Sequence, residues 1–551
     1  MANRDGNGRI ILHLDYDCFY AAVFEVDQPA LKSRPLAVQQ KQIVVTCNYE
    51  ARRRGLYKLQ RIQDARQVCP DAVIVLGEDL TQFRDVSKEL FLYLRSLIMG
   101  DRVERLGFDE LFLDVTDMID YNIDLLNINN SEHSFFHLDR QDPTVGFIYN
   151  ATEFYGPTWP PVDQQPTNSP ETRGYFLPPK SDLLCMRLLV ASHLAGYLRQ
   201  QLESHKGYTA TVGISTNKLL AKLAGKVHKP KSQTTLLPPY GVGEGPDVTI
   251  DSNVIRFMDS HDIRKIPGIG SKIAHKLHDH MSRSMDNPLT VRELRLLPGM
   301  GPGLLNRILG GPGYSKGMGA RVWGLIHGID DSEVLEAKDV PTQISIEDSY
   351  GRLDRFDIVK NELVKLTVSL LRRMRIDLTE EDSAGGAIRW RAHPRTLRLT
   401  SRPRRPSNPD NPYHNRMSRS AALPRYVFNM GDRVEAVAER LVQEHVLALF
   451  RRLHPEKSGW NLSLLNIAVT NIIDTAGDKK QNSGRDIGSM FQKQESVRIP
   501  AEDVTIHADE PTWEESDEDE AMPSVPCMVC GEMIPCFAVE AHEVYHQAPD
   551  E

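Results

Sequence analysis

The chain contains 551 residues, which exceeds what one hydrophobic core supports and predicts about three to four domains. Hydrophobic residues make up 40% of the sequence and no apolar run is long enough to span a bilayer, so we expect globular domains and no membrane segment. The net charge of −9 is unevenly distributed: residues 389–425 contain ten Arg and one acidic residue, whereas residues 502–520 contain ten acidic residues and no Lys or Arg. This segregation keeps nucleic acid among the expected partners.

Residues 10–14 predict a buried strand that ends at Asp15 and Asp17. Two carboxylates at a strand end repel each other unless a cation lies between them, and their hard oxygens suit Mg²⁺. Alternatively, Asp17 caps the helix expected at 19–26. The other elements predicted in this region are strands at 35–40, 43–47 and 72–76 and helices at 49–54, 62–68 and 79–99.

A second pair of acids, Asp109 and Glu110, lies at the tip of a β-hairpin predicted from strands at 102–106 and 111–115. If this hairpin lies beside the first strand, the pair comes close to Asp15. Three such carboxylates form the arrangement that holds two metal ions for an in-line displacement at phosphorus. A solvated turn is the simpler interpretation of Asp109 and Glu110 taken alone.

Cations from separate segments are suited to a triphosphate. Arg52 and Lys58 follow the strand at 43–47, and Lys229 follows the helix predicted at 217–227. Tyr20 lies one turn past Asp15, where its ring can stack against a sugar.

Residues 119–180 are rich in Asn, Pro, Gln and Asp, which predicts an insertion that is partly disordered. Regular structure resumes with a helix at 183–203 and a strand at 209–214. Two similar phrases, at 266–270 and 297–301, then predict helix-hairpin-helix turns. In such turns Gly268 and Gly270 let the backbone approach a DNA phosphate, although an ordinary helix-helix turn has the same pattern.

Residues 340–473 predict a separate βαββαβ domain of the ferredoxin-like type. Its strands are expected at 342–347, 395–400, 425–429 and 460–470, with helices at 355–374 and 434–453. Arg395 and Arg398 are candidates for contacts with DNA phosphates, which position a duplex without reading its sequence.

The tail combines an expected disordered linker at 474–525 with a compact end. Cys527, Cys530, His542 and His546 have the spacing of zinc ligands. Cys536 between these ligands is interpreted as a spare thiol. Cys18, Cys47, Cys69 and Cys185 are scattered, as in a reducing compartment, and the polar residues 1–8 lack a secretory signal. The apolar residues 487–491 stand alone in the linker and are similar to part of a sliding-clamp box.

These motifs together resemble the Y-family of translesion DNA polymerases. Its first signature is similar to HLDYDCFYAAVFE at 13–25, its second acidic motif to LGFDELFLD at 106–114, and its third stretch to GISTNKLLAKLAGKVHKP at 213–230. The runs VQQK at 38–41 and VVTCNYEAR at 44–52 are close to one branch of that family. The resemblance covers about residues 9–475, and the end of the chain is similar to a ubiquitin-binding zinc finger.

The resemblance implies an α/β multidomain fold shaped like a right hand. The implied parts are palm and fingers at 9–118, an insertion at 119–180, palm again at 181–250, a helix-hairpin-helix thumb at 251–335, a little finger at 340–473, a disordered linker at 474–525 and a zinc finger at 526–551.

The family also implies a role for individual residues. Asp15, Asp109 and Glu110, with the Tyr16 carbonyl, would hold two Mg²⁺ or Mn²⁺, and Asp17 would be supporting. Tyr20 would exclude ribonucleotides. The implied nucleotide contacts are Thr46, Tyr49, Arg52, Lys58 and Lys229, and the implied base-pair surface is Gln40, Lys41 and Ile43.

We therefore expect a nuclear DNA polymerase of low fidelity and low processivity that takes primer-template DNA and dNTPs and inserts opposite damaged bases. Ubiquitin or a ubiquitinated sliding clamp is a further expected partner, with Zn²⁺ in the tail. Two alternatives stay open: a palm-fold nucleotidyl cyclase with the same two metals, and a non-catalytic scaffold recruited to stalled forks.

Overall fold

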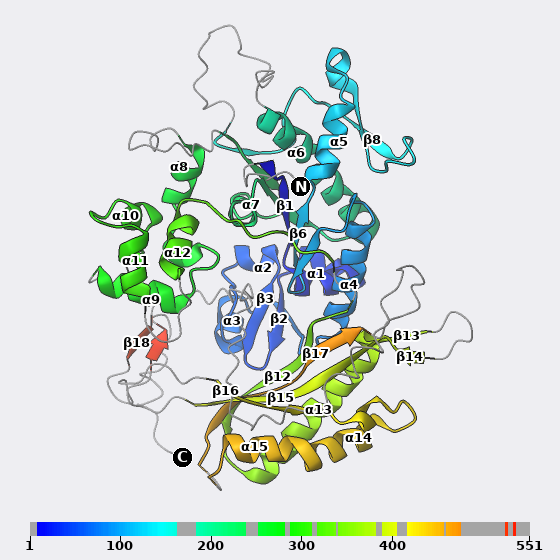
Figure 1. Cartoon of the computed structure of the whole chain (residues 1–551), viewed down its shortest axis with the longest axis vertical. Coiled ribbons are helices and arrows are strands. Elements are labelled where there is room, and N and C mark those ends of the chain that lie inside the picture. Colours follow the sequence, from blue (N-terminus) through cyan, green and yellow to red (C-terminus); the bar gives the residue numbers. More distant parts are fainter. Residues whose placement is uncertain are drawn as a thin grey trace, which may run out of the picture. The chain divides into compact units, whose positions relative to one another are not determined.

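The computed structural model describes residues 8–161, 183–238, 252–281, 287–310, 317–337, 340–381, 388–404, 416–456 and 459–474, with two short strands at Ser524–Pro526 and Met533–Pro535 (Figure 1). Internal contacts divide the chain into two compact units, with the main boundary between Ala337 and Lys338. Each unit is described below on its own. In the part of the chain described, no helix has both the length and the apolar character needed to cross a bilayer.

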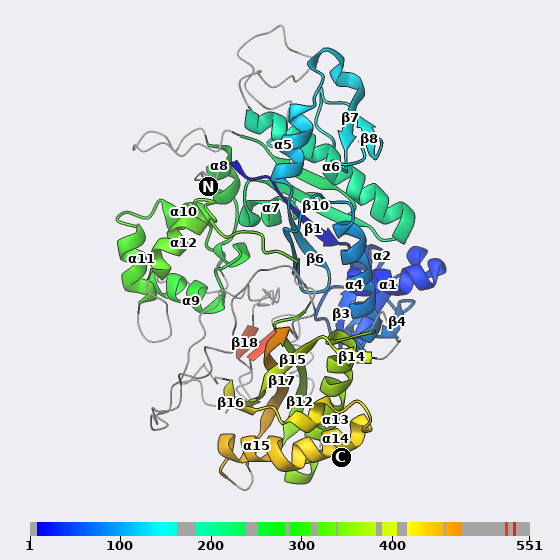
Figure 2. The same ribbon diagram turned by 45° about the vertical axis from the view of Figure 1, so that its right-hand side comes forward.

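A six-stranded sheet forms the centre of the first unit (Figure 2). Its central strand β1 pairs antiparallel with β6 on one side and with β10 on the other, and β11 and β9 extend the sheet in parallel. The strands, in sheet order, are β5 (Val103–Leu106), β6 (Glu110–Asp114), β1 (Ile11–Tyr16), β10 (Ala210–Ser215), β11 (Gln233–Leu236) and β9 (Thr158–Trp159). The hairpin of β5 and β6 beside the first strand confirms the sequence prediction.

The two faces of β1 have different surroundings, as its alternating side chains require. Leu12 and Leu14 join the large apolar core that includes the long helix α6 (Leu183–Lys206). Ile11 lies on the other face and packs with Phe112 and with Ala221 of α7 (Lys218–Ala224). His13 and Asp15 follow Ile11 at intervals of two and therefore lie on the face of α7.

Gly213 in β10 and Gly225 at the end of α7 let this helix approach the sheet closely. A Cβ at Gly213 in β10 would lie 1.9 Å from the Ala221 carbonyl oxygen and 2.3 Å from the Gly225 amide nitrogen. Neither is the end of a flexible side chain, so a larger residue at 213 must push the helix away from the sheet.

Residues 116–161, which include the first part of the expected insertion, contain regular structure. They form α5 (Thr116–Asp124), a 3₁₀ turn (Ile128–His133), the hairpin of β7 (Ser134–His137) and β8 (Gly146–Tyr149), and β9 of the central sheet. The cause is a small set of aromatic rings. The Phe136 ring stacks on that of Phe147 with 5.0 Å between ring centres, and Phe147 stacks on Tyr197 of α6 with 4.2 Å between ring centres. The average polar composition of the segment concealed these rings. Residues 162–182 lie outside the described part.

A smaller sheet, in the order β3-β2-β4, lies in the same unit. Its hairpin of β2 (Leu36–Gln40) and β3 (Ile43–Cys47) and its parallel strand β4 (Val73–Leu76) confirm the predicted strands. The helices α1 (Phe19–Asp27), α2 (Tyr49–Arg53), α3 (Ile62–Val68) and α4 (Thr81–Arg95) also form where expected, although α4 is shorter at both ends.

The Asn48 side chain connects these elements. Its carbonyl oxygen accepts hydrogen bonds from the Ala51 amide at 2.9 Å and the Leu36 amide at 3.1 Å. Its amide group donates to Glu25 in α1 and to the Arg34 carbonyl, both at 2.8 Å. One residue thus caps α2 and joins it to β2 and α1.

The rest of the first unit is helical, with α8 (Asn253–Asp259), α9 (Ser271–His280), α10 (Val291–Arg295), α11 (Pro302–Leu309) and α12 (Met318–Ile326). Both glycine phrases make the same turn: Gly268 and Gly299 have positive φ angles of 88° and 77°, and helices α9 and α11 follow at once. The second phrase is therefore as well formed as the first.

The second unit has the predicted βαββαβ chain order, with strands arranged β12-β17-β15-β16. Its main elements are β12 (Gln343–Leu353), α13 (Phe356–Asp377), β15 (Ala392–Pro403), β16 (Met417–Ala422), α14 (Val434–Leu441), a π turn (Val442–Val446), α15 (Leu447–Leu453) and β17 (Leu462–Asp474). The strand expected at 425–429 was wrong, because Arg425–Phe428 is a 3₁₀ turn and β16 precedes it. β16 consists mainly of small and polar residues with little apolar patterning, so no strand was predicted there.

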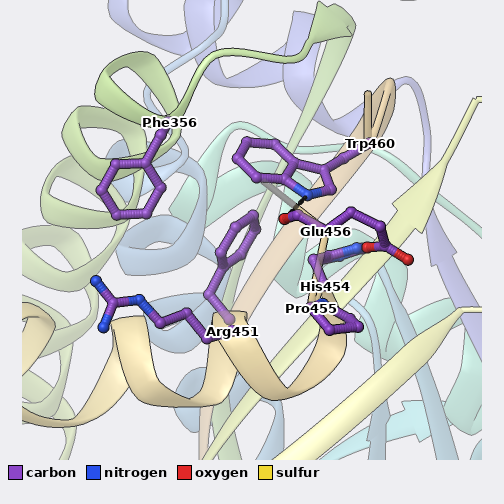
Figure 3. Close-up of a pocket in the computed structure, with 7 residues that line it drawn as sticks. Phe356, Arg451, His454, Pro455, Glu456 and Trp460 are labelled. Carbon is purple, nitrogen blue, oxygen red and sulfur yellow. Dashed lines mark hydrogen bonds between the residues drawn. The ribbon is translucent and has the colours of Figure 1, made fainter. Parts of the chain in front are cut away.

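A pocket of about 380 Å³ opens in the second unit where α13, α15 and β17 meet (Figure 3). Trp460 donates from its indole nitrogen to the Glu456 carbonyl at 2.9 Å, and His454 pairs with the Ser401 hydroxyl at 2.8 Å. The lining residues are Phe356, Phe450, Arg451, His454, Pro455, Glu456 and Trp460. None of the site residues predicted from the sequence lines this pocket.

The variant Gly213→Ala should destabilise the protein by about 1 to 3 kcal/mol, because its new methyl group must displace α7. The measurement is the thermal melting temperature. Gly303→Ala in α11 is the matched control, since a Cβ there meets nothing within 4 Å. Equal melting temperatures for the two variants would contradict the close packing of α7 on β10.

Candidate active site

The pairing of β1 with β6 determines the position of the acidic residues. Asp15 lies directly opposite Glu110 across the two antiparallel strands. Asp109 directly precedes Glu110, and its backbone carbonyl accepts a hydrogen bond from the Tyr16 amide at 2.8 Å. The three acids therefore come from two adjacent strands, at one end of the central pair.

Asp15 is 8% exposed and pairs with the ammonium of Lys229. Burial raises the pKa of Asp15, although Lys229 opposes this shift. The same contact raises the pKa of Lys229 against the effect of its own burial, so Lys229 is charged. The pair places a cation at the carboxylate that the sequence predicted to bind metal.

Asp17 supports the loop that carries Lys229. Its carboxylate accepts hydrogen bonds from the Thr211 hydroxyl and from the Lys231 backbone amide, both at 2.9 Å. Asp17 thus joins β10 to the residues after α7. This is a supporting position and it is separate from the ion pair at Asp15.

Glu110 has two basic neighbours. The Lys222 ammonium of α7 donates to its Oε2 at 2.6 Å, and the His13 imidazole lies 3.6 Å from the same oxygen. Burial opposes ionisation of Glu110, but these two neighbours outweigh it and hold its pKa well below the usual range. Burial lowers the pKa of His13. Glu110 is therefore a carboxylate at neutral pH.

Asp109 behaves differently. Burial and the nearby carboxylates of Asp15 and Glu110 raise its pKa to about 7. Its ionisation is thus coupled to both other acids, which shows that the three groups share one electrostatic environment. A cation placed among them would relieve this repulsion.

The three acids do not form a finished metal site as they stand. Within the residues described, no three His, Cys, Asp or Glu side chains are gathered closely enough to hold a metal ion. The physical reason is that Asp15 and Glu110 each turn toward a lysine. The donors themselves, three carboxylates beside the Tyr16 backbone, are the hard oxygens that Mg²⁺ and Mn²⁺ bind, so the residues present fit these ions.

The predicted phosphate side lies near the acids. The Arg52 guanidinium lies 4.7 Å from the Tyr49 ring centre and donates to the Cys47 carbonyl at 3.2 Å. Burial and Cys18 raise the pKa of Tyr49 to about 12, while Arg52 and Lys229 act against the shift. The charges of Arg52 and Lys229 therefore both influence the ionisation of Tyr49. Thr46 is half-buried in β3, and Lys58 is exposed after α2.

Tyr20 in α1 belongs to an aromatic stack. Its ring lies 4.2 Å from that of Phe83 in α4, nearly parallel at 20°, and 6.2 Å from Phe108 beside Asp109. Phe83 is fully buried. The stack therefore holds the Tyr20 ring at a fixed height relative to the acids.

The tip of the β2–β3 hairpin carries the predicted base-pair surface. Gln40 and Ile43 are paired across the hairpin, and Lys41 turns the chain with a positive φ of 51°. The side-chain amide of Gln40 donates to the Gly77 carbonyl at 2.7 Å, and the backbone amide of Lys41 donates to the Glu78 carboxylate at 3.2 Å. The tip is thus fixed to the residues after β4.

In the second unit, the two predicted DNA contacts lie on β15. Leu397 and Leu399 face the core, whereas Arg398 points away from it and donates to Gln343 at 3.0 Å. Arg395 is exposed. The predicted zinc ligands and residues 487–491 lie outside the described part of the chain.

The sequence did not predict roles for Lys222, His13 or Phe83. A signal was present for the lysine, since the apolar helix predicted at 217–227 contains three Lys at intervals of four residues, Lys218, Lys222 and Lys226. Lys218 and Lys222 are buried beside carboxylates, and Lys218 pairs with Glu104 at 2.8 Å. A lysine at an apolar position is thus evidence of an acidic partner.

Comparison with known proteins gives first a family and then particular relatives. Residues 14–226 match the model described as the impB/mucB/samB family. The chain is similar to proteins named DNA polymerase iota: it is 33% identical to that of Homo sapiens over 469 residues, or 85% of this chain and 53% of the human protein. It is 31% identical to that of Mus musculus over 478 residues, which are 86% of this chain and 55% of the mouse protein. It is 36% identical to that of Drosophila melanogaster over 274 residues, which are 49% of this chain and 31% of the fly protein.

The matched region, residues 14–226, contains most of the site residues that the sequence predicted in the first unit, including Asp15, Arg52 and Glu110. Lys229, Gly268 and Gly270 lie beyond it. The chain spans about half the length of the human and mouse proteins that it matches.

The raised pKa of Asp109 predicts a pH effect on the metal-free protein. The folded carboxyl binds its proton more tightly than the unfolded one, so ionisation removes stability as pH rises from 3.8 to about 7. In the presence of EDTA, Asp109→Asn should melt close to the wild type at pH 4 and several degrees above it at pH 8. Parallel melting-temperature curves across this range would show that burial does not perturb Asp109.

Proposed function

We propose that the protein is a template-directed DNA polymerase that inserts dNTPs opposite damaged template bases. The observation that carries this proposal is the pairing of Asp15 with Glu110 across β1 and β6, with Asp109 next in the chain. The likeness to proteins named DNA polymerase iota supports it. The substrate class is a primer-template duplex with an incoming dNTP.

In the proposed mechanism, Asp15, Asp109, Glu110 and the Tyr16 carbonyl hold two divalent cations, Mg²⁺ or Mn²⁺. When bound, these ions activate the primer hydroxyl and stabilise the charge of the in-line displacement at phosphorus. Glu110 lies nearest the hydroxyl. With Asp15 holding a cation, Lys229 would be available to bind the triphosphate.

The remaining nucleotide contacts follow from the same placement. Arg52 and Tyr49 bind the triphosphate together with Thr46 and Lys58, and the positive charges offset the phosphate charge. Tyr20 lies against the sugar. Its ring excludes a 2′-hydroxyl because Phe83 prevents it from moving away.

Gln40, Lys41 and Ile43 form the surface over the nascent base pair. The fixing of this hairpin tip by Gln40 supports a rigid, narrow surface. Such a surface favours Hoogsteen pairing of template purines, which gives low and uneven fidelity. Processivity is low because the fingers are small.

We assign residues 9–118 and 181–250 to palm and fingers, 251–335 to the thumb and 340–473 to the little finger. Gly268 and Gly270 in the thumb and Arg395 and Arg398 in the little finger contact DNA phosphates. The positive φ of Gly268 supports this, since its turn leads directly into the N-terminus of α9.

The tail is proposed as a recruiting region that acts in the nucleus. Cys527, Cys530, His542 and His546 bind one Zn²⁺ and form a finger at 526–551 that binds ubiquitin or a ubiquitinated sliding clamp. The spacing of these four residues supports zinc binding. Residues 487–491 are a second candidate contact with the clamp.

Two alternatives remain to be separated from this proposal. A nucleotidyl cyclase uses the same two metals but has no need of a duplex, so the two helix-hairpin-helix turns argue against it. A scaffold without catalysis has no need of three coupled carboxylates, and their arrangement argues against that. Primer extension distinguishes all three.

Purified protein should extend a primer on a template with Mg²⁺. The double variant Asp109→Ala with Glu110→Ala should lose at least about a thousandfold in rate, because several kcal/mol of charge stabilisation is lost. Asp142→Ala removes an exposed acid on the β7–β8 hairpin and is the control. Equal extension by the double variant, or none by the wild type, would refute the polymerase.

Tyr20→Ala should lower the preference for dNTP over rNTP at least about tenfold, since 1.4 kcal/mol of lost steric exclusion already corresponds to that factor. Tyr20→Phe keeps the ring and should keep the preference. The measurement is kcat/KM for a matched dNTP and rNTP pair. An unchanged ratio in Tyr20→Ala would remove the assignment to the sugar.

Elemental analysis of the purified full chain should find one zinc per molecule. Cys527→Ser combined with Cys530→Ser should remove it, because two of four ligands are lost. Cys536→Ser is the control and should retain the metal. Zinc-free wild-type protein would contradict the finger.

A further inference from the structure

Lys222 makes a buried contact with one of the three acids. Its ammonium donates to Glu110 Oε2 at 2.6 Å, and its side chain is only 9% exposed. Burying a lysine is costly unless a carboxylate compensates its charge. Lys222 therefore cannot leave Glu110 without leaving two buried charges unpaired.

The helix that carries Lys222 is held by β10 and by a cap at its N-terminus. Its backbone lies against Gly213 of β10, where no Cβ fits. Its first turn is capped by Asn217, which accepts from the Leu220 amide at 2.8 Å and donates to the Gly328 carbonyl at 2.9 Å. The position of the ammonium is therefore set by the backbone of the fold.

Lys229 provides a contrast within the same site. It pairs with Asp15, but it lies in the loop after α7 and its side chain is 29% exposed. The two acids that face each other across β1 and β6 thus each pair with a lysine, and the lysine at Glu110 is the more deeply buried of the two.

We propose that Lys222 is a positioning residue of the reaction: it holds Oε2 of Glu110 so that the carboxylate faces Asp15 and offers its other oxygen to the divalent cation. This inference rests on the proposed function for its chemical role. His13 assists at the same oxygen, since its Nε2 lies 3.6 Å from Oε2 and its ring centre lies 4.9 Å from that of Phe112.

The test compares Lys222→Met with Lys206→Met. Lys206 makes a Lys–Glu contact of the same length, 2.6 Å to Glu89, at the end of α6 and away from the acids. Mn²⁺ binding is measured by electron paramagnetic resonance without nucleotide or turnover. If Lys222 acted only through its positive charge, its removal would tighten Mn²⁺ binding. If Lys222 positions Glu110, its removal weakens Mn²⁺ binding, so the direction of the change in affinity separates the two roles.

Lys222→Met should weaken Mn²⁺ binding about 10- to 100-fold, as loss of a group that orients a metal ligand does, and Lys206→Met should not change it. Equal or tighter binding in Lys222→Met would overturn the proposal. This readout needs no polymerase activity, so it stands even where primer extension fails. If Lys222→Met does not fold, as judged by circular dichroism, Lys222→Gln replaces it.

In primer extension, Lys222→Met should lower the rate of incorporation at saturating dNTP while KM for dNTP stays within about twofold, because Lys222 acts through Glu110. In a Glu110→Gln background, Lys222→Met should cause no additional loss. Losses that multiply in the double variant would show that Lys222 acts elsewhere and would overturn the proposal.

Discussion

The repulsion between Asp15 and Glu110 is the constraint on which the first unit depends. Antiparallel pairing of β1 with β6 places the two carboxylates opposite each other in a largely buried setting, where their mutual charge is strongly felt. The surrounding chain supplies the compensation. Lys222 comes from a helix packed on β10, and Lys229 comes from the loop that follows that helix.

Several local features have a common explanation in that constraint. Gly213 has no side chain because α7 must come close enough for Lys222 to reach β6. Asp17 is turned toward β10 because its hydrogen bonds hold the backbone next to Lys229. Burial and the carboxylates of Asp15 and Glu110 raise the pKa of Asp109 although Lys229 opposes the shift, and a cation bound among the three acids would relieve this repulsion.

Much of this region could be predicted from the sequence because its strands are short and strongly patterned. The apolar run before Asp15 and the acidic hairpin tip were sufficient to predict the strands, whereas their adjacency was a condition of the three-acid site and was not itself predicted. The role of Lys222 could not be predicted, since periodicity shows that a helix is amphipathic and not which strand it faces. The regular structure within residues 119–161 could not be predicted, because a few aromatic contacts with Tyr197 outweighed a polar composition. β16 was missed because edge strands need little apolar patterning.

The hydrogen bonds of Asn48 have a wider consequence. Its amide uses its full capacity of two acceptor and two donor bonds, all within one small region. Helix α2, which carries Tyr49 and Arg52, and helix α1, which carries Tyr20, are therefore joined through a single side chain. Under the proposed function, recognition of the phosphate end and of the sugar end of one nucleotide would be mechanically linked through Asn48.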